Sequence, residues 1–286
     1  MSTPALSSPE EAAVGGGEPL LLHRPGTARV HDFFLGGKDN YAADRDLAHR
    51  ILRVLPRATA AARGNRAFLA RAVRTLAGRG IRQFVDLGCG LPTSDNVHQM
   101  AARHISGTRV LYVDHDPLVI AHARALLVDD GNIAALRADL REPAAILGSR
   151  EMRRLIDPAE PVALILSCVL HFLPDPSGPV AALTASAAPG SALVISHATA
   201  DFAPVAVTEA ARLYRDACAT PLIPRPAAEL ERLFAPFRLL DPGITPAAHW
   251  HPDLPPRPTG QALLYAGVAI RDNEPSWGAW PAHWTR

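Results

Sequence analysis

An acid followed by two glycines is the first group of residues in this sequence with the types and spacing to do chemistry. Asp86, Gly88 and Gly90 end an apolar run that begins at Ile81, and the run has the length of one buried strand. Glycine allows unusual backbone dihedral angles and lets the backbone approach a ligand with no Cβ in the way. Open α/β sheets bind nucleotides at such turns, at the carboxyl ends of strands. The motif therefore predicts a nucleotide site.

The spacing of the glycines indicates which kind of nucleotide binds. A dinucleotide fingerprint has a third glycine three positions after the second, and Thr93 occupies that position. No Gly-Lys-Ser/Thr sequence follows, which excludes a phosphate-cradling P-loop. The remaining pattern, Asp-x-Gly-x-Gly, resembles motif I of the class I S-adenosylmethionine (SAM) methyltransferases. The alternative is a plain strand–turn–helix that binds no ligand.

A second acid lies at the end of the next predicted strand. Asp114 closes the run that begins at Arg109 and lies about 24 residues past Gly90, where an acid accepts hydrogen bonds from both ribose hydroxyls of a nucleotide. The alternative is that Asp114 caps the helix that follows, but Asp116 is the better candidate for that cap. We therefore predict that Asp114 binds the ribose.

Four stretches of the chain carry a more specific resemblance. They are Arg29–Arg45, with Leu-Gly-Gly-Lys-Asp-Asn-Tyr at its centre, Arg63–Leu69, Asp86–Thr93 and Val113–Pro117. Together they resemble a largely bacterial family of SAM-dependent methyltransferases long known as a domain of unknown function. The resemblance covers residues 27–270 approximately, and it implies both the fold and SAM as the cofactor. It does not imply a substrate.

The resemblance also suggests how the methionyl and adenine parts of SAM are held. Arg63 is expected to pair with the methionyl carboxylate, because a guanidinium binds carboxylates in a planar, bidentate way, and leucine-type carboxyl methyltransferases have an arginine at a similar distance before the glycine turn. Asn65 and Arg66 would support it, and the alternative is a solvated basic face. Class I enzymes place an acid that accepts from the adenine amino group at the end of the third strand, where this sequence has Asp139, with Leu140 against the ring. The alternative for Asp139 is a helix cap.

Further cofactor contacts are expected from strand ends and from the turn near the N-terminus. Asp86, His115 and Ser167 lie at or beside predicted strand ends, and we include them among the cofactor-binding residues. The turn that carries Asn40 and Tyr41 is rich in Gly, Asp and Asn. It is either an αα-corner with capping residues or part of a lid whose Asn40 and Tyr41 face the cofactor.

Two histidines are candidate catalytic bases. His171 and His197 close the predicted fourth and fifth strands, and parallel strands end at one edge of a sheet, so both side chains could border one pocket. A neutral imidazole has an unperturbed pKa of about 6.5 and can take a proton from a hydroxyl. The alternative is that both histidines are structural and donate to neighbouring carbonyls.

These residues need a framework of alternating strands and helices. Short apolar runs alternate with helical segments along the chain, which is typical of an α/β fold. The resemblance implies a class I methyltransferase fold, with a seven-stranded, mostly parallel sheet in the order 3-2-1-4-5-7-6, an antiparallel last strand and helices on both faces. We expect a disordered leader at residues 1–22 and a single domain at residues 23–286, with an N-terminal helical lid at 27–76 and an inserted substrate region at 200–235.

Composition limits the partners. The 286 residues carry a formal net charge of +1, which gives no electrostatic reason to expect nucleic acid. Cys89, Cys168 and Cys218 are too few and too scattered for a disulfide framework or a zinc site, so we expect no metal and a reducing, cytoplasmic location. No apolar run reaches transmembrane length, and the N-terminus lacks the basic-then-apolar order of a signal peptide.

Together these features predict a SAM-dependent methyltransferase that acts on an O or N nucleophile of a small molecule. Two alternatives remain, a SAM-binding regulatory module without turnover and an NAD(P)-dependent oxidoreductase. The missing third glycine counts against the oxidoreductase. The sequence does not identify the methyl acceptor or the oligomeric state.

Overall fold

The structure is a computed structural model that describes residues 22–128, 131–218, 220–253 and 262–272. Except for Leu22, the predicted leader lies outside these ranges. Within them, no helix combines the length and the apolar character needed to cross a membrane.

A mixed sheet forms the centre of the described chain. Its longer strands are short apolar runs buried along most of their length, as expected for strands covered on both faces. The strands are β1 (Gln83–Leu87), β2 (Arg109–Asp114), β3 (Ile133–Arg137), β4 (Val162–Ser167), β5 (Ala192–Ala198), β6 (Arg238–Leu239), β7 (Thr245–Pro246) and β8 (Leu264–Ile270).

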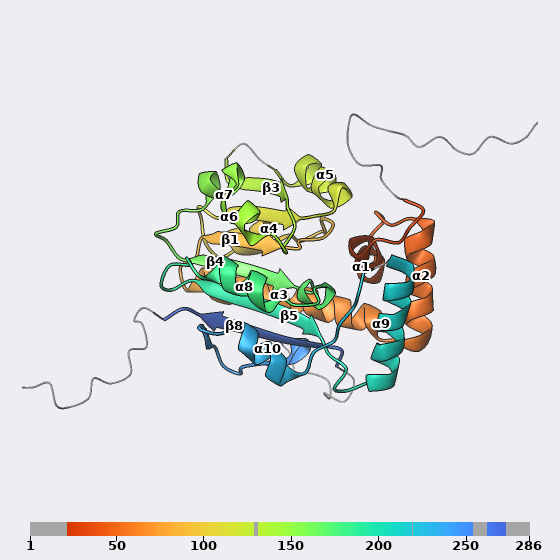
Figure 1. Cartoon of the computed structure of the whole chain (residues 1–286). Coiled ribbons are helices and arrows are strands. Elements are labelled where there is room, and N and C mark those ends of the chain that lie inside the picture. Colours follow the sequence, from red (N-terminus) through yellow and green to blue (C-terminus); the bar gives the residue numbers. More distant parts are fainter. Residues whose placement is uncertain (1–21, 129–130, 219, 254–261, 273–286) are drawn as a thin grey trace, which may run out of the picture.

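The strand order is β3-β2-β1-β4-β5-β8-β6 (Figure 1). The first five strands pair in parallel, whereas β8 runs antiparallel to β5. This confirms the predicted order, with β8 in the place of the seventh strand. The difference is the short β7, which pairs with β8 as an additional strand.

Helices cover both faces of the sheet because successive strand residues point to opposite sides. In β1, Phe84 joins the apolar cluster under one set of helices, and its neighbours Val85 and Leu87 join the cluster under the other set. The first set is α3 (Ala58–Gly78), α4 (Val97–Ala102) and α5 (Pro117–Leu126), and the second is α6 (Pro143–Leu147), α7 (Arg150–Leu155), α8 (Ser177–Thr184) and α10 (Ala227–Leu233).

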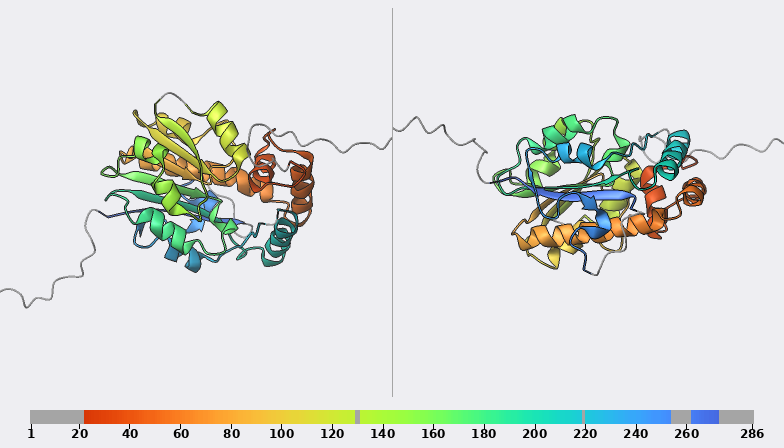
Figure 2. Two further views of the ribbon diagram at one scale, coloured as in Figure 1. Left: turned by 45° about the horizontal axis from the view of Figure 1, so that its top comes forward. Right: turned by 90° about the horizontal axis from the view of Figure 1, so that it is seen from below.

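A third group of helices lies at the carboxyl edge of the parallel strands. It consists of α1 (Thr27–Leu35), α2 (Ala42–Val54) and α9 (Pro204–Cys218), which lie side by side in Figures 1 and 2. Val30, Leu47 and Leu213 bury against one another there, in an apolar cluster that also takes in the start of α3. Most of α3 packs on the sheet instead. Within the predicted lid, α1, α2 and the start of α3 therefore lie at the edge where the parallel strands end, whereas the rest of α3 does not.

Candidate functional site

A cavity of about 410 Å³ lies at this carboxyl edge, between the glycine turn and the group of α1, α2 and α9. Its volume falls within the range of small-molecule sites. Its wall is formed by the ends of β1, β2 and β4 and by α1, the first half of α3 and α9. The predicted cofactor residues that line it are Asp86, Gly88, Gly90, Asp114, His115, Asp139, Leu140 and Ser167.

The two glycines of the turn have different structural roles. Gly88 has φ of +73°, and a Cβ added to it would lie 2.3 Å from Cγ2 of Val169, so the neighbouring loop packs directly on its backbone. Gly90 has φ of +66°, and an added Cβ would meet nothing within 4 Å. Both conformations favour glycine. Gly88 thus permits packing, whereas Gly90 presents bare backbone to open space in the cavity.

Asp114 is held in a fixed orientation at the end of β2. Its Oδ2 accepts from the backbone N–H of Gly90 at 3.0 Å, and its Oδ1 accepts from Asp116 N–H at 3.0 Å. Asp116 in turn caps α5 through Leu118 N–H at 2.8 Å, which confirms the predicted cap. The neighbouring His115 has its Nδ1 3.5 Å from Asp114, and this contact raises the pKa of the imidazole.

Arg66, rather than Arg63, reaches the cavity. Arg66 lines it and donates to Thr93 Oγ1 at 2.8 Å and to the carbonyl of Asp95. Arg63 is exposed and does not line the cavity, so the structure gives no support to its predicted carboxylate role. Burial raises the pKa of Asp86 to about 7, although the charge of Arg66 opposes this shift. The site therefore brings the half-buried guanidinium of Arg66 close to a carboxyl group whose pKa is near neutral.

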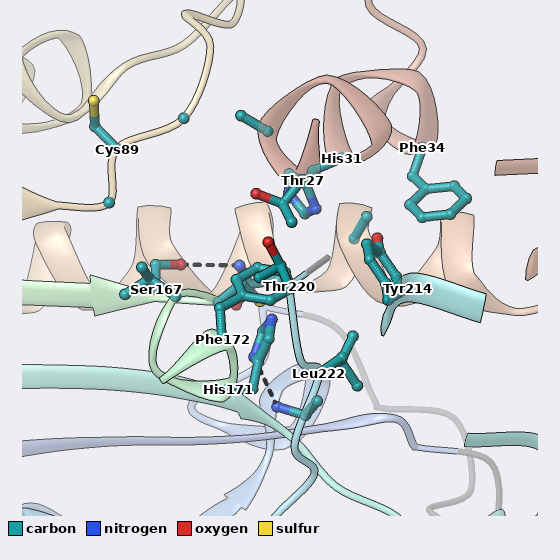
Figure 3. A pocket seen from close by; sticks show the side chains of 18 of the residues that line it. Thr27, His31, Phe34, Cys89, Ser167, His171, Phe172, Tyr214, Thr220 and Leu222 are labelled. Carbon is teal, nitrogen blue, oxygen red and sulfur yellow. Dashed lines mark hydrogen bonds between the residues drawn. The ribbon is translucent and has the colours of Figure 1, made fainter. Parts of the chain in front are cut away.

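Asn65 and Ser167 form a polar pair in the floor of the cavity. Asn65 Nδ2 donates to Ser167 Oγ at 2.9 Å (Figure 3). The other amide atom of Asn65, Oδ1, is buried and has no hydrogen-bond partner among the described residues. Because a buried acceptor without a donor is costly, this oxygen is a candidate ligand-binding atom.

Asp139 and Leu140 line the cavity next to the end of β3. The carboxylate of Asp139 accepts from Arg141 Nε at 3.0 Å and from Arg141 Nη2 at 2.5 Å, and this bonding lowers its pKa. Leu140 is 7% exposed and adds an apolar surface beside it. Asp139 is therefore an ionised acceptor at neutral pH.

Asn40 and Tyr41 do not belong to the cavity wall in the described part of the chain. Asn40 Nδ2 donates to Asp32 Oδ2 at 2.8 Å and to the carbonyl of Gly37 at 3.1 Å, while Tyr41 N–H donates to Asp44 at 2.8 Å. These bonds close the turn between α1 and α2. Of the two alternatives for this turn, the contacts match the αα-corner with capping residues. We therefore do not retain the predicted contact of Asn40 and Tyr41 with the cofactor.

His197 is a structural residue and cannot act as the proposed base. It is fully buried in β5 and does not line the cavity. Its Nδ1 lies 2.8 Å from the carbonyl of Ala198 and its Nε2 lies 3.1 Å from Nη1 of Arg225. A carbonyl oxygen can only accept a hydrogen bond and a guanidinium can only donate one. The neutral ring of His197 therefore has its proton on Nδ1, which donates, and Nε2 accepts. No lone pair is left for a substrate proton.

His171 lines the cavity but does not end a strand. It lies in a 3₁₀ turn, η1 (Leu170–Phe172), that follows β4. The backbone N–H of Ala198 donates to its Nδ1 at 3.3 Å, so the ring proton lies on Nε2. Burial lowers the pKa of His171 well below its usual value. The ring is a neutral hydrogen-bond donor toward the cavity, not a proton acceptor.

Because His197 is buried, we expect the stability of the fold to depend measurably on pH. Burial lowers its pKa in the folded protein to about 4, against 6.5 when unfolded. As the pH falls, His197 therefore binds a proton in the unfolded chain before it does so in the folded protein. The free energy of unfolding consequently decreases as the pH falls from about 6.5 to 4. Over that pH interval, the free energy of unfolding of the wild-type protein is expected to fall by about 3 kcal/mol more than that of His197→Gln. Urea unfolding at each pH measures the difference.

The matched variant separates His197 from other titrating groups. Asp86 has a raised pKa and acts in the opposite direction, but it is present in both proteins and cancels in the comparison. Equal loss of stability in the two proteins would show that His197 does not stay neutral in the fold.

Comparison with known proteins decides which family this architecture represents. A family model described as S-adenosyl methyltransferase matches residues 17–272. The chain belongs to this family. SAM is its cofactor, and the protein is a methyltransferase, which decides against the oxidoreductase. No curated protein matches the chain.

Solved structures agree with the family assignment. A putative methyltransferase from Thermobifida fusca YX is 41% identical, with 87% of this chain and 96% of that chain covered and a TM-score of 0.83. A DUF574 family protein from Streptomyces avermitilis MA-4680 is 37% identical, with 87% and 98% covered and a TM-score of 0.83. The plantazolicin methyltransferase BamL, at 10% identity and a TM-score of 0.54, shares the fold alone.

The residues of this methyltransferase fit SAM. The cavity offers bare backbone at Gly90, an unpartnered buried acceptor at Asn65 and a half-buried guanidinium at Arg66. These suit a close approach of the methionyl part, an ammonium group and a carboxylate, respectively. Among the described residues, no His, Cys, Asp and Glu side chains are grouped so that three or more could hold a metal ion.

Sequence reasoning missed the residues at the far end of the methyltransferase cavity. Thr27, His31 and Phe34 all line it from α1, and their spacing of four and three residues puts them on one helix face. That spacing was a usable signal. Phe172 lines the same end from η1, and nothing local in its sequence pointed to the site. Tyr214 of α9, which also lines this end, is the exception, since it falls within the substrate region that the sequence predicts at 200–235 (Figure 3).

Proposed function

We propose that this methyltransferase transfers the methyl group of SAM to an O or N atom of a small molecule. The observation that carries the proposal is one continuous cavity, which joins the glycine turn to a largely apolar end under α1 and α9. SAM would occupy the first part and the acceptor the second. The group of α1, α2 and α9 would be the lid and substrate region that the sequence predicts at 27–76 and 200–235.

The chain's own residues would hold the cofactor at several points. Asp114 would accept from the ribose hydroxyls, and Asp139 would accept from the adenine amino group beside Leu140. Arg66 would bind the carboxylate, and Asn65 Oδ1 and Asp86 would lie near the ammonium group. Gly88, Gly90, His115 and Ser167 would complete the wall. SAM supplies an electrophilic methyl group when it is bound.

Catalysis would come mainly from holding the acceptor in line with that methyl group. Positioning of this kind can supply several kcal/mol, on the order of 7 or more in favourable cases. The walls of the cavity would also limit the access of water to the reacting atoms. We also infer a cytoplasmic location, which is supported by three cysteines that form no disulfide.

Calorimetry with SAM, S-adenosylhomocysteine (SAH) and NAD tests the assignment of the cavity. We expect SAM and SAH to bind and NAD to give no heat. Asp114→Asn should weaken SAH binding about 10- to 100-fold, because the ribose loses a charged acceptor worth about 1.5–3 kcal/mol. Asp157→Asn, at a surface position away from the cavity, is the control and should bind SAH normally. Equal affinity of Asp114→Asn and wild type would contradict the ribose role.

Labelled SAM tests turnover. Incubation of the protein with methyl-labelled SAM and a metabolite extract should give a labelled small molecule. A protein that binds SAM and yields no labelled product under any extract would instead be the binding module considered above.

A further inference from the structure

The end of the cavity away from the glycine turn has its own chemistry. Six of its residues define what we call the acceptor lobe: Phe34, Phe172, Tyr214, Leu222, His31 and His171. The rings of Phe172 and Tyr214 lie 5.9 Å apart, and those of His171 and Phe172 lie 4.4 Å apart. In Figure 3 the labelled residues of the lobe lie away from Cys89 of the glycine turn, toward the opposite side of the view. Its wall is therefore mostly aromatic and apolar.

The six residues of the acceptor lobe carry no charge of their own at pH 7, although the positive charge of Arg66 acts on His31 from the cofactor end of the cavity. Burial lowers the pKa of His31 to about 4 and that of His171 well below its usual value, so both rings are neutral at pH 7. The acids and arginines of the cavity wall come from the glycine turn, the strand ends and their loops, apart from Arg66 on α3 and Asp32 on α1. Asp32 is bound by Asn40. Moving a charged acceptor from water into this lobe would be costly, so the lobe suits an uncharged ring.

The two histidines of the lobe offer complementary hydrogen bonds. The Nδ1 of His171 accepts from Ala198 N–H, so Nε2 carries the proton and donates. Neither ring nitrogen of His31 has a hydrogen-bond partner among the described residues, and a neutral imidazole keeps one free acceptor nitrogen. Figure 3 shows the two side chains entering the lobe from opposite sides, from α1 and from the loop after β4. One donor and one acceptor match a hydroxyl group, which accepts and donates.

We propose that the methyl acceptor is an uncharged aromatic ring compound with a hydroxyl group, and that His31 is the catalytic base for methylation of its oxygen. The Nε2–H of His171 would hold the hydroxyl oxygen in place. This inference rests on the methyl transfer proposed above and specifies its acceptor. It replaces the base assigned from the sequence to His171 or His197.

The step balances without any further reagent. The hydroxyl proton passes to the free ring nitrogen of His31, and an oxygen lone pair forms the bond to the methyl carbon. The bond between that carbon and the sulfonium sulfur breaks, and its electron pair stays on sulfur. The positive charge thus moves from the sulfonium sulfur to the imidazole of His31, so the net charge of the whole cavity is unchanged, and the imidazolium releases its proton after the methyl ether leaves.

Three probes of the same ring size test the chemistry of the lobe. Calorimetry with the SAH-saturated protein compares 2-naphthol, 2-naphthoate and 2-naphthylmethylammonium. We expect 2-naphthol to bind at least 10-fold more tightly than either charged probe. Failure of 2-naphthol to bind, or equal binding of a charged probe, overturns the proposal. If SAH itself does not bind, the proposed function fails before the acceptor is in question.

Substitution of His31 tests its catalytic role. With SAM and 2-naphthol, His31→Gln should lower the rate of methyl ether formation about 100-fold, which is within the contribution of a positioned base, with SAH affinity and 2-naphthol affinity nearly unchanged. His31→Phe should weaken 2-naphthol binding as well, because it removes the acceptor atom. His49→Gln is the matched control, since His49 is an exposed histidine on α2 outside the cavity wall. Wild-type turnover in His31→Gln overturns the role of His31 as the base.

Discussion

Replacing Arg66 with methionine is expected to weaken SAH binding about 100-fold. Arg66 has a half-buried guanidinium at the cofactor end of the cavity, and it also donates to Thr93 Oγ1 at 2.8 Å. A hydrogen bond to a charged group contributes about 1.5–3 kcal/mol, and about 2.7 kcal/mol corresponds to 100-fold in affinity. Calorimetric titration with SAH measures the effect.

Arg63→Met provides the matched control. Arg63 lies on the same helix three residues earlier, but it is exposed and does not line the cavity. Its replacement should leave SAH affinity within about 2-fold of wild type, since exposed charges contribute little. A larger loss from Arg63→Met than from Arg66→Met would restore the role that the sequence suggested for Arg63.

Replacing Arg225 with methionine is expected to destabilise the fold by about 3–5 kcal/mol. The buried Arg225 donates to the carbonyls of Leu173 and Pro174, each at 2.9 Å, and bonds His197 Nε2 at 3.1 Å. These acceptors are left unpaired when the guanidinium is removed, and each unsatisfied buried group is costly. For a domain of this size we expect Tm to fall by about 10 °C, as measured by thermal denaturation.

Arg212→Met is the control for Arg225. Arg212 of α9 makes ion pairs with Glu209 and Asp216 at 2.7 Å, but all three side chains are well exposed. Exposed ion pairs contribute little because solvent screens them, so the Tm should hardly change. If Arg225→Met melted at the wild-type temperature, the hydrogen bonds of Arg225 would not be holding the loop after β4 against β5.

The sequence was most informative where a function depends on neighbouring residues. Gly88, Gly90 and Asp114 were predicted because a strand, a glycine turn and a following acid form one local unit. The fold followed from the same logic, since alternating apolar runs and helical segments favour an α/β sheet. The order of the strands came from the family resemblance, and the structure adds only β7 to it.

The local sequence pattern could not identify a cavity residue where the answer depended on which face of a helix turns toward the sheet. Arg63 and Arg66 have the same chemistry and lie three residues apart on α3. The packing of Phe68 and Leu76 against the sheet fixes which face of this helix is turned inward, and Arg66 then reaches the cavity while Arg63 remains in solvent. The helical period alone does not identify that face.

The sequence by itself therefore determined the sheet, the glycine turn and the acid that follows β2, because each depends on contacts between close neighbours or on the rule that parallel strands end together. Only the tertiary structure shows which groups surround each histidine. His197 is tied to Arg225, and His31 and Tyr214 meet in one lobe although α1 and α9 are far apart in the chain. Burial and hydrogen-bond partners set the protonation of each ring, and both arise only when distant segments pack together.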